Sequence, residues 1–191
     1  TSCGPSCIKI TGGGALAYAA KEQPSTILLA NDMTLHTSVN MNPGGGLITI
    51  KSKDPSQPVT LSGGWSGDTA EFGVRIFSIS PGAQVTIEDV HIENGRPPVG
   101  EGGCVAVRGA NTHVAFKNVH FEKCSTESNG GAIAITSGAT VTLDAGSVTM
   151  ADNSAAAEGD DIYISSADLT CATQLQRHER RCRPSVGARH V

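Results

Sequence analysis

The chain has 191 residues, a net charge of −4 and a sequence pI near 5.8. This length fits one domain, and the small negative charge gives no reason to expect a nucleic-acid partner. No apolar run approaches the roughly 18 residues that a membrane span needs, so we expect no membrane-spanning segment.

The N-terminal part of the chain is rich in alanine. Residues 15–21 (ALAYAAK) do not read as a strand, and we expect a short helix there that closes one end of the domain, within a cap formed by residues 1–24. Four alternating segments follow, at 26–29, 33–35, 47–50 and 59–61, and their pattern predicts short strands.

From Gly73 onward the sequence repeats itself with a period of about 28 residues, which lies in the range of solenoids. Further repeats start at Gly102 and Gly130, and a partial one starts at Gly159. Each unit holds short alternating segments separated by glycine-containing turns, and none shows a helical pattern. A propeller blade would need four strands and a longer repeat. We therefore predict an all-β fold, a right-handed parallel β-helix of about five coils.

Alignment of the repeats predicts which side chains stack inside the column. Every inward position is apolar in each full repeat, and Val85, Val114 and Val141 form one such stack. A shift of one residue in the strand register would turn these side chains outward, so the pattern predicts the register as well as the fold.

The cysteines number six, an even count without the paired spacing of a zinc site. The simplest pairing is local, Cys3 with Cys7, Cys104 with Cys124, and Cys171 with Cys182, although Cys104 and Cys124 could instead be buried free thiols. Terminal disulfides would indicate an oxidising compartment, and we expect an extracellular or cell-surface protein. A chain that starts with Thr rather than Met agrees with removal of a signal peptide, and equally with a recombinant fragment.

The regular pattern stops near Thr170. We therefore expect one β-helix domain over residues 1–170 and a basic tail over residues 171–191, tethered by Cys182. The arginines of this tail could contact an anionic surface, but a solvated tail is the simpler interpretation.

Two motifs suggest a family. The glycine pairs at 102–105 (GGCV) and 130–133 (GGAI), with 121–124 (FEKC) and 150–153 (MADN), resemble the GGA(I/L/V) and FxxN motifs of polymorphic outer-membrane-protein repeats. Residues 25–166 resemble the pectate-lyase-like superfamily of right-handed parallel β-helices. The resemblance implies the fold and not one activity, because this scaffold carries adhesins, passenger domains, lyases and hydrolases.

One outward ladder is charged. Glu88, Lys117 and Asp144 occupy equivalent outward positions in three repeats, where opposite charges stabilise neighbouring strands. A polysaccharide lyase needs a cation beside a uronate carboxylate and a base that removes the α-proton, and Lys117 between the two acids is the candidate for that chemistry. A stabilising surface ladder is the simpler interpretation.

A second outward cluster combines two imidazoles with two carboxylates. His91 and Glu93 stack on His120 and Glu122, because residues two apart point the same way and neighbouring coils lie about 4.8 Å apart. Such a set could bind a divalent metal of the zinc type, the only cofactor that we consider. A pH-sensitive patch and an accidental stack of polar residues are the alternatives.

The outward positions of the first strand in each repeat are small, which predicts a flat wall suited to packing against a partner or against the tail. This candidate interface comprises Ser78, Cys104, Ala106, Ala132 and Ala134. Thr60, Thr86 and Thr142 also suggest the threonine ladder of an ice-binding protein, but Ala115 interrupts it.

We expect a secreted or surface-displayed β-helix that serves as a structural, adhesive or assembly module. Its partner would be a cell-surface or extracellular-matrix protein, a polysaccharide, or a second copy of the chain. The alternative is a small polysaccharide-acting enzyme of the lyase type, or a carbohydrate-binding module, that uses the outward charged ladder.

Overall fold

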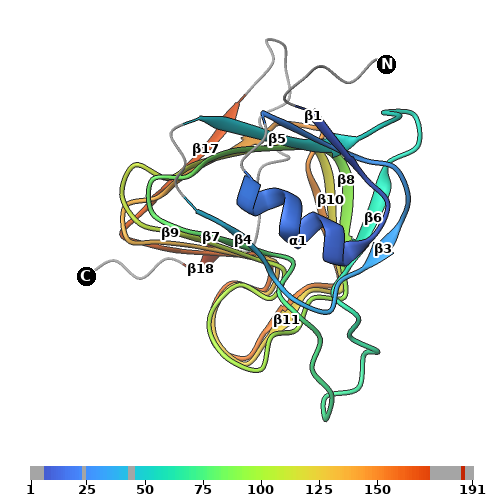
Figure 1. Ribbon diagram of the computed structural model, residues 1–191. Coiled ribbons are helices and arrows are strands. Elements are labelled where there is room, and N and C mark those ends of the chain that lie inside the picture. The colour runs from blue at the N-terminus through green and yellow to red at the C-terminus, as the bar shows by residue number, and fades with distance from the viewer. Residues whose placement is uncertain (1–6, 23–24, 43–45, 173–185, 188–191) are drawn as a thin grey trace.

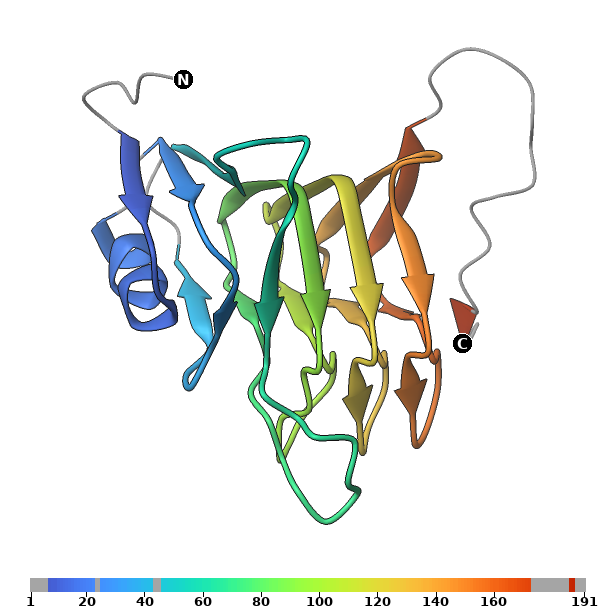
Figure 2. The ribbon, with the colours of Figure 1, turned by 90° about the vertical axis from the view of Figure 1, so that its right-hand side faces the viewer.

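The computed structural model describes residues 7–22, 25–42, 46–172 and 186–187, with only the backbone of 21–22, 171–172 and 186–187. The chain winds into an all-β parallel solenoid of about five turns, seen along the axis in Figure 1 and from the side in Figure 2. The predicted fold is confirmed at this level.

The secondary structure follows the repeats closely. In chain order the elements are β1 (Cys7–Ile10), α1 (Gly13–Glu22), β2 (Thr26–Leu29), β3 (Met33–Thr34), β4 (Val39–Met41), β5 (Leu47–Ser52), β6 (Val59–Ser62), β7 (Phe77–Ile79), β8 (Gln84–Glu93), β9 (Val105–Arg108), β10 (His113–Glu122), β11 (Ser125–Thr126), β12 (Ile133–Thr136), β13 (Thr140–Asp144), β14 (Thr149–Ala151), β15 (Ser154–Ala155), β16 (Ile162–Ser165), β17 (Asp168–Ala172) and β18 (Val186–Gly187).

The strands form the walls of the column. The largest sheet follows the order β1-β2-β5-β8-β10-β13-β17, with β3, β6 and β14 beside it. A second sheet follows β18-β16-β12-β9-β7-β4, and β11 pairs with β15. The sequence did not predict the strands β1, β4, β11, β15, β17 and β18.

The predicted cap helix is confirmed as α1, which lies across one end of the column (Figures 1 and 2). Its inner side chains Leu16, Ala19 and Ala20 are buried, and Tyr18 is exposed. The helix starts at Gly13, where a Cβ atom would lie 2.8 Å from the carbonyl oxygen of Thr34. Only glycine allows the helix to approach the first coil this closely.

The predicted stacks fill the interior. Val114 pairs with Val85 on one side and with Val141 on the other, and all three are at most 2% exposed. In the same strand the rings of Phe116 and Phe121 meet edge to face at 5.3 Å. The apolar columns predicted from the repeat are therefore the core of the molecule.

The long strands β8 and β10 each bend around a corner of the column. Asp89 and Asn118 occupy the bends with φ of 55° and 49°, a backbone region that Asp and Asn tolerate better than most residues. The Asn118 side-chain amide donates a hydrogen bond of 2.9 Å to Asp89 Oδ1, so the corner of one coil supports the next.

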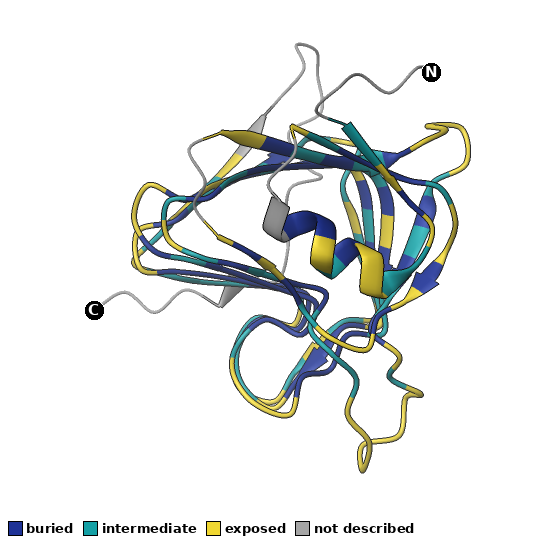
Figure 3. Ribbon diagram, in the orientation of Figure 1, coloured by how far each residue is buried: buried dark blue, intermediate teal, exposed yellow. Residues whose placement is uncertain are grey.

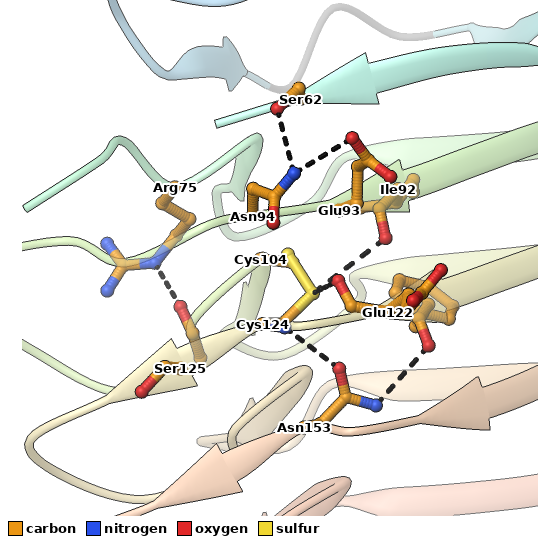
Figure 4. Close-up of a disulfide and its surroundings, with 12 residues drawn as sticks. Ser62, Arg75, Ile92, Glu93, Asn94, Cys104, Glu122, Cys124, Ser125 and Asn153 are labelled. Carbon is orange, nitrogen blue, oxygen red and sulfur yellow. Dashed lines mark hydrogen bonds between the residues drawn. A yellow bond between two sulfur atoms is a disulfide. The ribbon is translucent and has the colours of Figure 1, made fainter. Parts of the chain in front are cut away.

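The Cys104–Cys124 disulfide is confirmed, with a Cα–Cα distance of 5.4 Å, and the free-thiol alternative is wrong. Cys7 is also disulfide-bonded. The predicted pairings with Cys3 and with Cys182 lie outside the described residues. Figure 4 shows the Cys104–Cys124 bond at the base of the loops that leave the column.

Strand pairing continues beyond the predicted end of the domain. β17 runs to Ala172, which pairs with Asp144, and β18 lies within the predicted tail yet pairs with β16. The boundary at residue 170 therefore falls inside a strand. No helix in the described ranges is long and apolar enough to cross a membrane.

Candidate functional site

Two adjacent outward ladders carry polar side chains across several coils. Strand register places Thr60, His91, His120 and Thr149 in one row, and Thr34, Ser62, Glu93 and Glu122 in the next. We call these eight residues the polar strip. The predicted His–Glu cluster forms its middle, and the sequence did not predict that the strip extends to Thr34, Thr60 and Ser62.

The histidines of the polar strip lie side by side. Their ring centroids are 5.6 Å apart, in an edge-to-face arrangement. His120 Nδ1 shares a hydrogen bond of 2.7 Å with Thr149 Oγ1, and His120 Nε2 lies 3.6 Å from Glu122 Oε2. The imidazole of His120 is thus oriented by two coils at once.

The carboxylates of the polar strip also have partners. Glu93 Oε1 accepts a hydrogen bond of 2.8 Å from the Asn94 side chain (Figure 4), and Glu122 Oε1 accepts one of 2.6 Å from Lys123 Nζ. The hydrogen bond and charge of Lys123 hold the pKa of the partly exposed Glu122 carboxyl below its usual value, and Glu122 raises the pKa of Lys123. Glu122 is therefore ionised at neutral pH.

The end of the polar strip nearest α1 is hollowed. An open, shallow pocket of about 430 Å³ lies there, and its lining residues are Asp32, Met33, Thr34, Thr60, Ser62 and Glu93. Asp32 Oδ1 accepts a hydrogen bond of 2.7 Å from the backbone of Thr60, which fixes the carboxylate in place. Hydroxyl groups and carboxylates at this density suit a ligand that both donates and accepts hydrogen bonds.

The register brings the four predicted metal ligands together, as expected. Among the described residues, however, no group of three or more His, Cys, Asp or Glu side chains has an arrangement that could hold a metal ion. His120 Nδ1 is already hydrogen-bonded to Thr149, and Glu122 Oε1 is already hydrogen-bonded to Lys123. A divalent metal at His91, Glu93, His120 and Glu122 stays a prediction.

The charged ladder is longer than predicted. Lys117 pairs with Glu88 across strands and forms a salt bridge of 3.0 Å with it, while Lys51 occupies the position beside Glu88 on the other side. Asp144 forms no ion pair with Lys117 in the described part of the chain. Alternation of Lys51, Glu88 and Lys117 gives each charge an opposite neighbour, as a stabilising ladder requires.

The wall of small residues is mostly enclosed. Cys104, Ala106, Ala132 and Ala134 are at most 1% exposed, and Ser78 is half-buried. Gly102, in the loop before β9, lies against the next coil, because a Cβ atom built on it would lie 3.1 Å from the backbone nitrogen of Ala134. Little of the predicted interface is therefore open to solvent, as Figure 3 shows for the strands at the base of the loops.

The threonine ladder has a different membership from the one predicted. Thr60 pairs with His91 and so belongs to the polar strip, which makes its predicted place beside Thr86 wrong. The true column is Thr26, Thr49, Thr86, Ala115, Thr142 and Thr170. One alanine still interrupts it, and the charged ladder lies beside it.

The chain matches no protein-family model, no curated protein and no solved structure. The class that the fold defines is therefore a parallel β-solenoid, and the assignment of a function depends on the surface chemistry of this chain alone.

Proposed function

We propose that the protein is a secreted or surface-displayed β-helix of the pectate-lyase-like type that serves as an adhesive module and binds polysaccharide along the polar strip. The observation that carries this proposal is the hollowed double row of hydroxyl, imidazole and carboxylate groups. Within each row the groups recur at the spacing of neighbouring strands, about 4.8 Å. A chain of sugar units offers hydrogen-bonding groups with a comparable regularity.

The covalent structure supports an extracellular location. Disulfides persist in oxidising compartments, and this chain carries the Cys104–Cys124 bond and a bonded Cys7. A rigid column with an oriented polar face is suited to adhesion, because little side-chain freedom is lost when a ligand binds.

Calorimetric titration with a panel of soluble neutral and acidic polysaccharides tests the proposal. The double substitution Ser62→Ala and Glu93→Gln, both on the wall of the pocket, should weaken binding at least about tenfold. Thr142→Ala, on the outward threonine column, is the matched control and should leave affinity unchanged. The proposal fails if no polysaccharide binds, or if the control loses as much affinity as the double variant.

The same samples test the competing function of a polysaccharide lyase. A lyase acting through Lys117 would release unsaturated products that absorb ultraviolet light, and Lys117→Ala would abolish the signal. The salt bridge between Lys117 and Glu88 gives this lysine a structural role that needs no substrate. We therefore expect no product from any polyuronate.

A further inference from the structure

Two arginines from neighbouring coils meet at one loop. Gly100 has φ of +84°, and a Cβ atom built on it would lie 3.3 Å from Arg75 Nη2 and 3.7 Å from Arg108 Nη2. The space that this glycine leaves empty is therefore bordered by both guanidinium groups. Arg108 ends β9, and Arg75 lies just before the neighbouring strand β7.

The position of Arg75 is fixed by the loop. Its Nε donates a hydrogen bond of 2.8 Å to the carbonyl oxygen of Gly102, and Nη2 donates to the carbonyl oxygens of Glu101 at 2.8 Å and Val99 at 3.3 Å. Figure 4 shows Arg75 beside the Cys104–Cys124 disulfide, which anchors the same loop. The guanidinium group is thus held in place without any ligand.

Arg108 has a different environment. In the described part of the chain it forms no hydrogen bond through its side chain and no ion pair, although it is half-buried. The Glu101 carboxylate, which is the acidic group nearest in sequence, accepts a hydrogen bond of 2.9 Å from the Asn129 side chain. The two arginines are consequently not neutralised by a salt bridge.

This pairing of like charges is costly. Burial and, to a smaller extent, the charge of Arg108 lower the pKa of Arg75 to about 10, and Glu101 only partly opposes them. A chain with a net charge of −4 nevertheless concentrates two cations at one loop. An anion between them would supply a negative charge to both arginines and hydrogen-bond acceptors to Arg108.

The neighbouring groups suit such an anion. Thr136 pairs with Arg108 in the strand register and adds a hydroxyl group to the same face of the sheet. Arginine presents its donors as a planar fork that matches the oxygens of carboxylate, sulfate and phosphate groups. The site belongs to the sheet of β7, β9 and β12, whereas the polar strip belongs to the sheet of β6, β8 and β10.

We propose that Arg75 and Arg108 form a binding site for an oxyanion, that is, a carboxylate, sulfate or phosphate group, at the loop that contains Gly100. This site is separate from the polar strip and does not depend on the function proposed for it. Arg75 supplies a fixed positive charge, because its Nε and Nη2 atoms already donate to the loop. Arg108 supplies the side-chain donors that bind the anion.

Titration of the full chain with sodium sulfate, sodium phosphate and sodium glucuronate, at constant ionic strength, tests the site. We expect at least one of these probes to bind, and Arg108→Gln to weaken that binding about tenfold or more. Lys117→Gln is the matched control, because it removes one positive charge from another face and should leave the affinity unchanged. The three probes distinguish which oxyanion the site prefers.

The amide resonances of the unmodified protein provide a second measurement that does not depend on a variant. Shifts on titration that centre on Gly100, Arg108 and Thr136 support the site. Shifts confined to other regions overturn the proposal, as does equal affinity of the parent and Arg108→Gln. A complete lack of binding by all three probes at millimolar concentration overturns it too, while leaving the polysaccharide proposal intact.

Discussion

At the scale of single residues, Arg96 anchors the loop of residues 63–76, which joins β6 to β7. Its side chain is nearly buried, forms an ion pair with Glu127, and lies 5.2 Å from the ring centroid of Trp65 and 5.4 Å from that of Phe72. The Nε atom of Arg96 has no partner in the described part of the chain. The cation–π contacts and the single ion pair must therefore offset the burial of a charged group.

Arg96→Ala should loosen the loop that carries Trp65. We expect a loss of about 2 kcal/mol in the free energy of unfolding, because both the packing of the arginine stem and the cation–π contacts disappear. Trp65 is the only tryptophan, so its emission should shift to longer wavelength in the folded protein and report the change directly.

Glu127→Gln is the control for this experiment. The glutamine keeps a side-chain oxygen that can accept the hydrogen bond from Arg96 and leaves the cation–π contacts in place, so this variant should lose less stability than Arg96→Ala and should not shift the Trp65 emission. An unchanged emission spectrum in Arg96→Ala would contradict the anchoring role of this arginine.

The Cys104–Cys124 disulfide joins residues 20 positions apart in sequence. Closure of a loop of this size restricts the unfolded chain by about 3 kcal/mol. The double variant Cys104→Ala, Cys124→Ala should lose a similar amount in urea unfolding. Substitution isolates this bond better than reduction does, because Cys7 is also disulfide-bonded. An unfolding midpoint equal to that of the parent would rule out a stabilising role.

At the scale of elements, β10 demonstrates how register separates interior from surface. Val114 is 2% exposed and stacks on valines above and below, whereas the next residue, Ala115, faces outward between Thr86 and Thr142. Adjacent residues of one strand therefore occupy opposite environments, as the two-residue period of a strand requires.

The same substitution at these two positions tests the register. Val114→Thr places a hydroxyl in the apolar column and should cost about 1–3 kcal/mol. Ala115→Thr should change stability by no more than about 0.5 kcal/mol, because it completes the outward threonine column. Comparison of their thermal unfolding curves is the measurement, and equal losses in the two variants would show that the register is incorrect.

The repeat explains which parts of the structure could be predicted from the sequence. Equal spacing in the later repeats allowed Val114 to be aligned with Val85 and Val141, and the outward His–Glu cluster followed from that alignment. The earlier coil is irregular, because its wall is divided into β5 and β6 by residues 53–58 whereas β8 is continuous. Thr60 was therefore placed in the wrong ladder.

Other features depend on long side chains rather than on the strand period. Lys51 was not predicted to join Glu88, because the register of β5 with β8 was unknown. Arg75 precedes β7 whereas Arg108 ends β9, and only the fold of the Gly100 loop shows that both guanidinium groups reach the same glycine. A repeat pattern predicts which strand residues stack. It does not predict which side chains a loop between the strands will contact.

At the scale of the whole molecule, each coil is stabilised by its neighbours. β8 and β10 have paired strands on both sides, whereas β14 pairs only with β10 among the described strands. In such a linear array, opening is expected to begin where neighbours are fewest.

Amide hydrogen exchange should therefore be slowest in β8, β10 and β12 and faster in β14 and β15. Mass spectrometry of peptides after exchange for increasing times measures this gradient. The α1 cap covers the first coils and should slow exchange in β2 as well, so the gradient is expected to be asymmetric along the axis. Uniform exchange across all strands would contradict this description.

The constant register of β9, β12 and β16 has a consequence for how such a column can change in evolution. Tandem duplication of one complete repeat would add a coil whose strands already match those of the coils on either side. The length of the solenoid can therefore change by one coil at a time. The distance between its two ends would change without any alteration of the apolar core inside each coil.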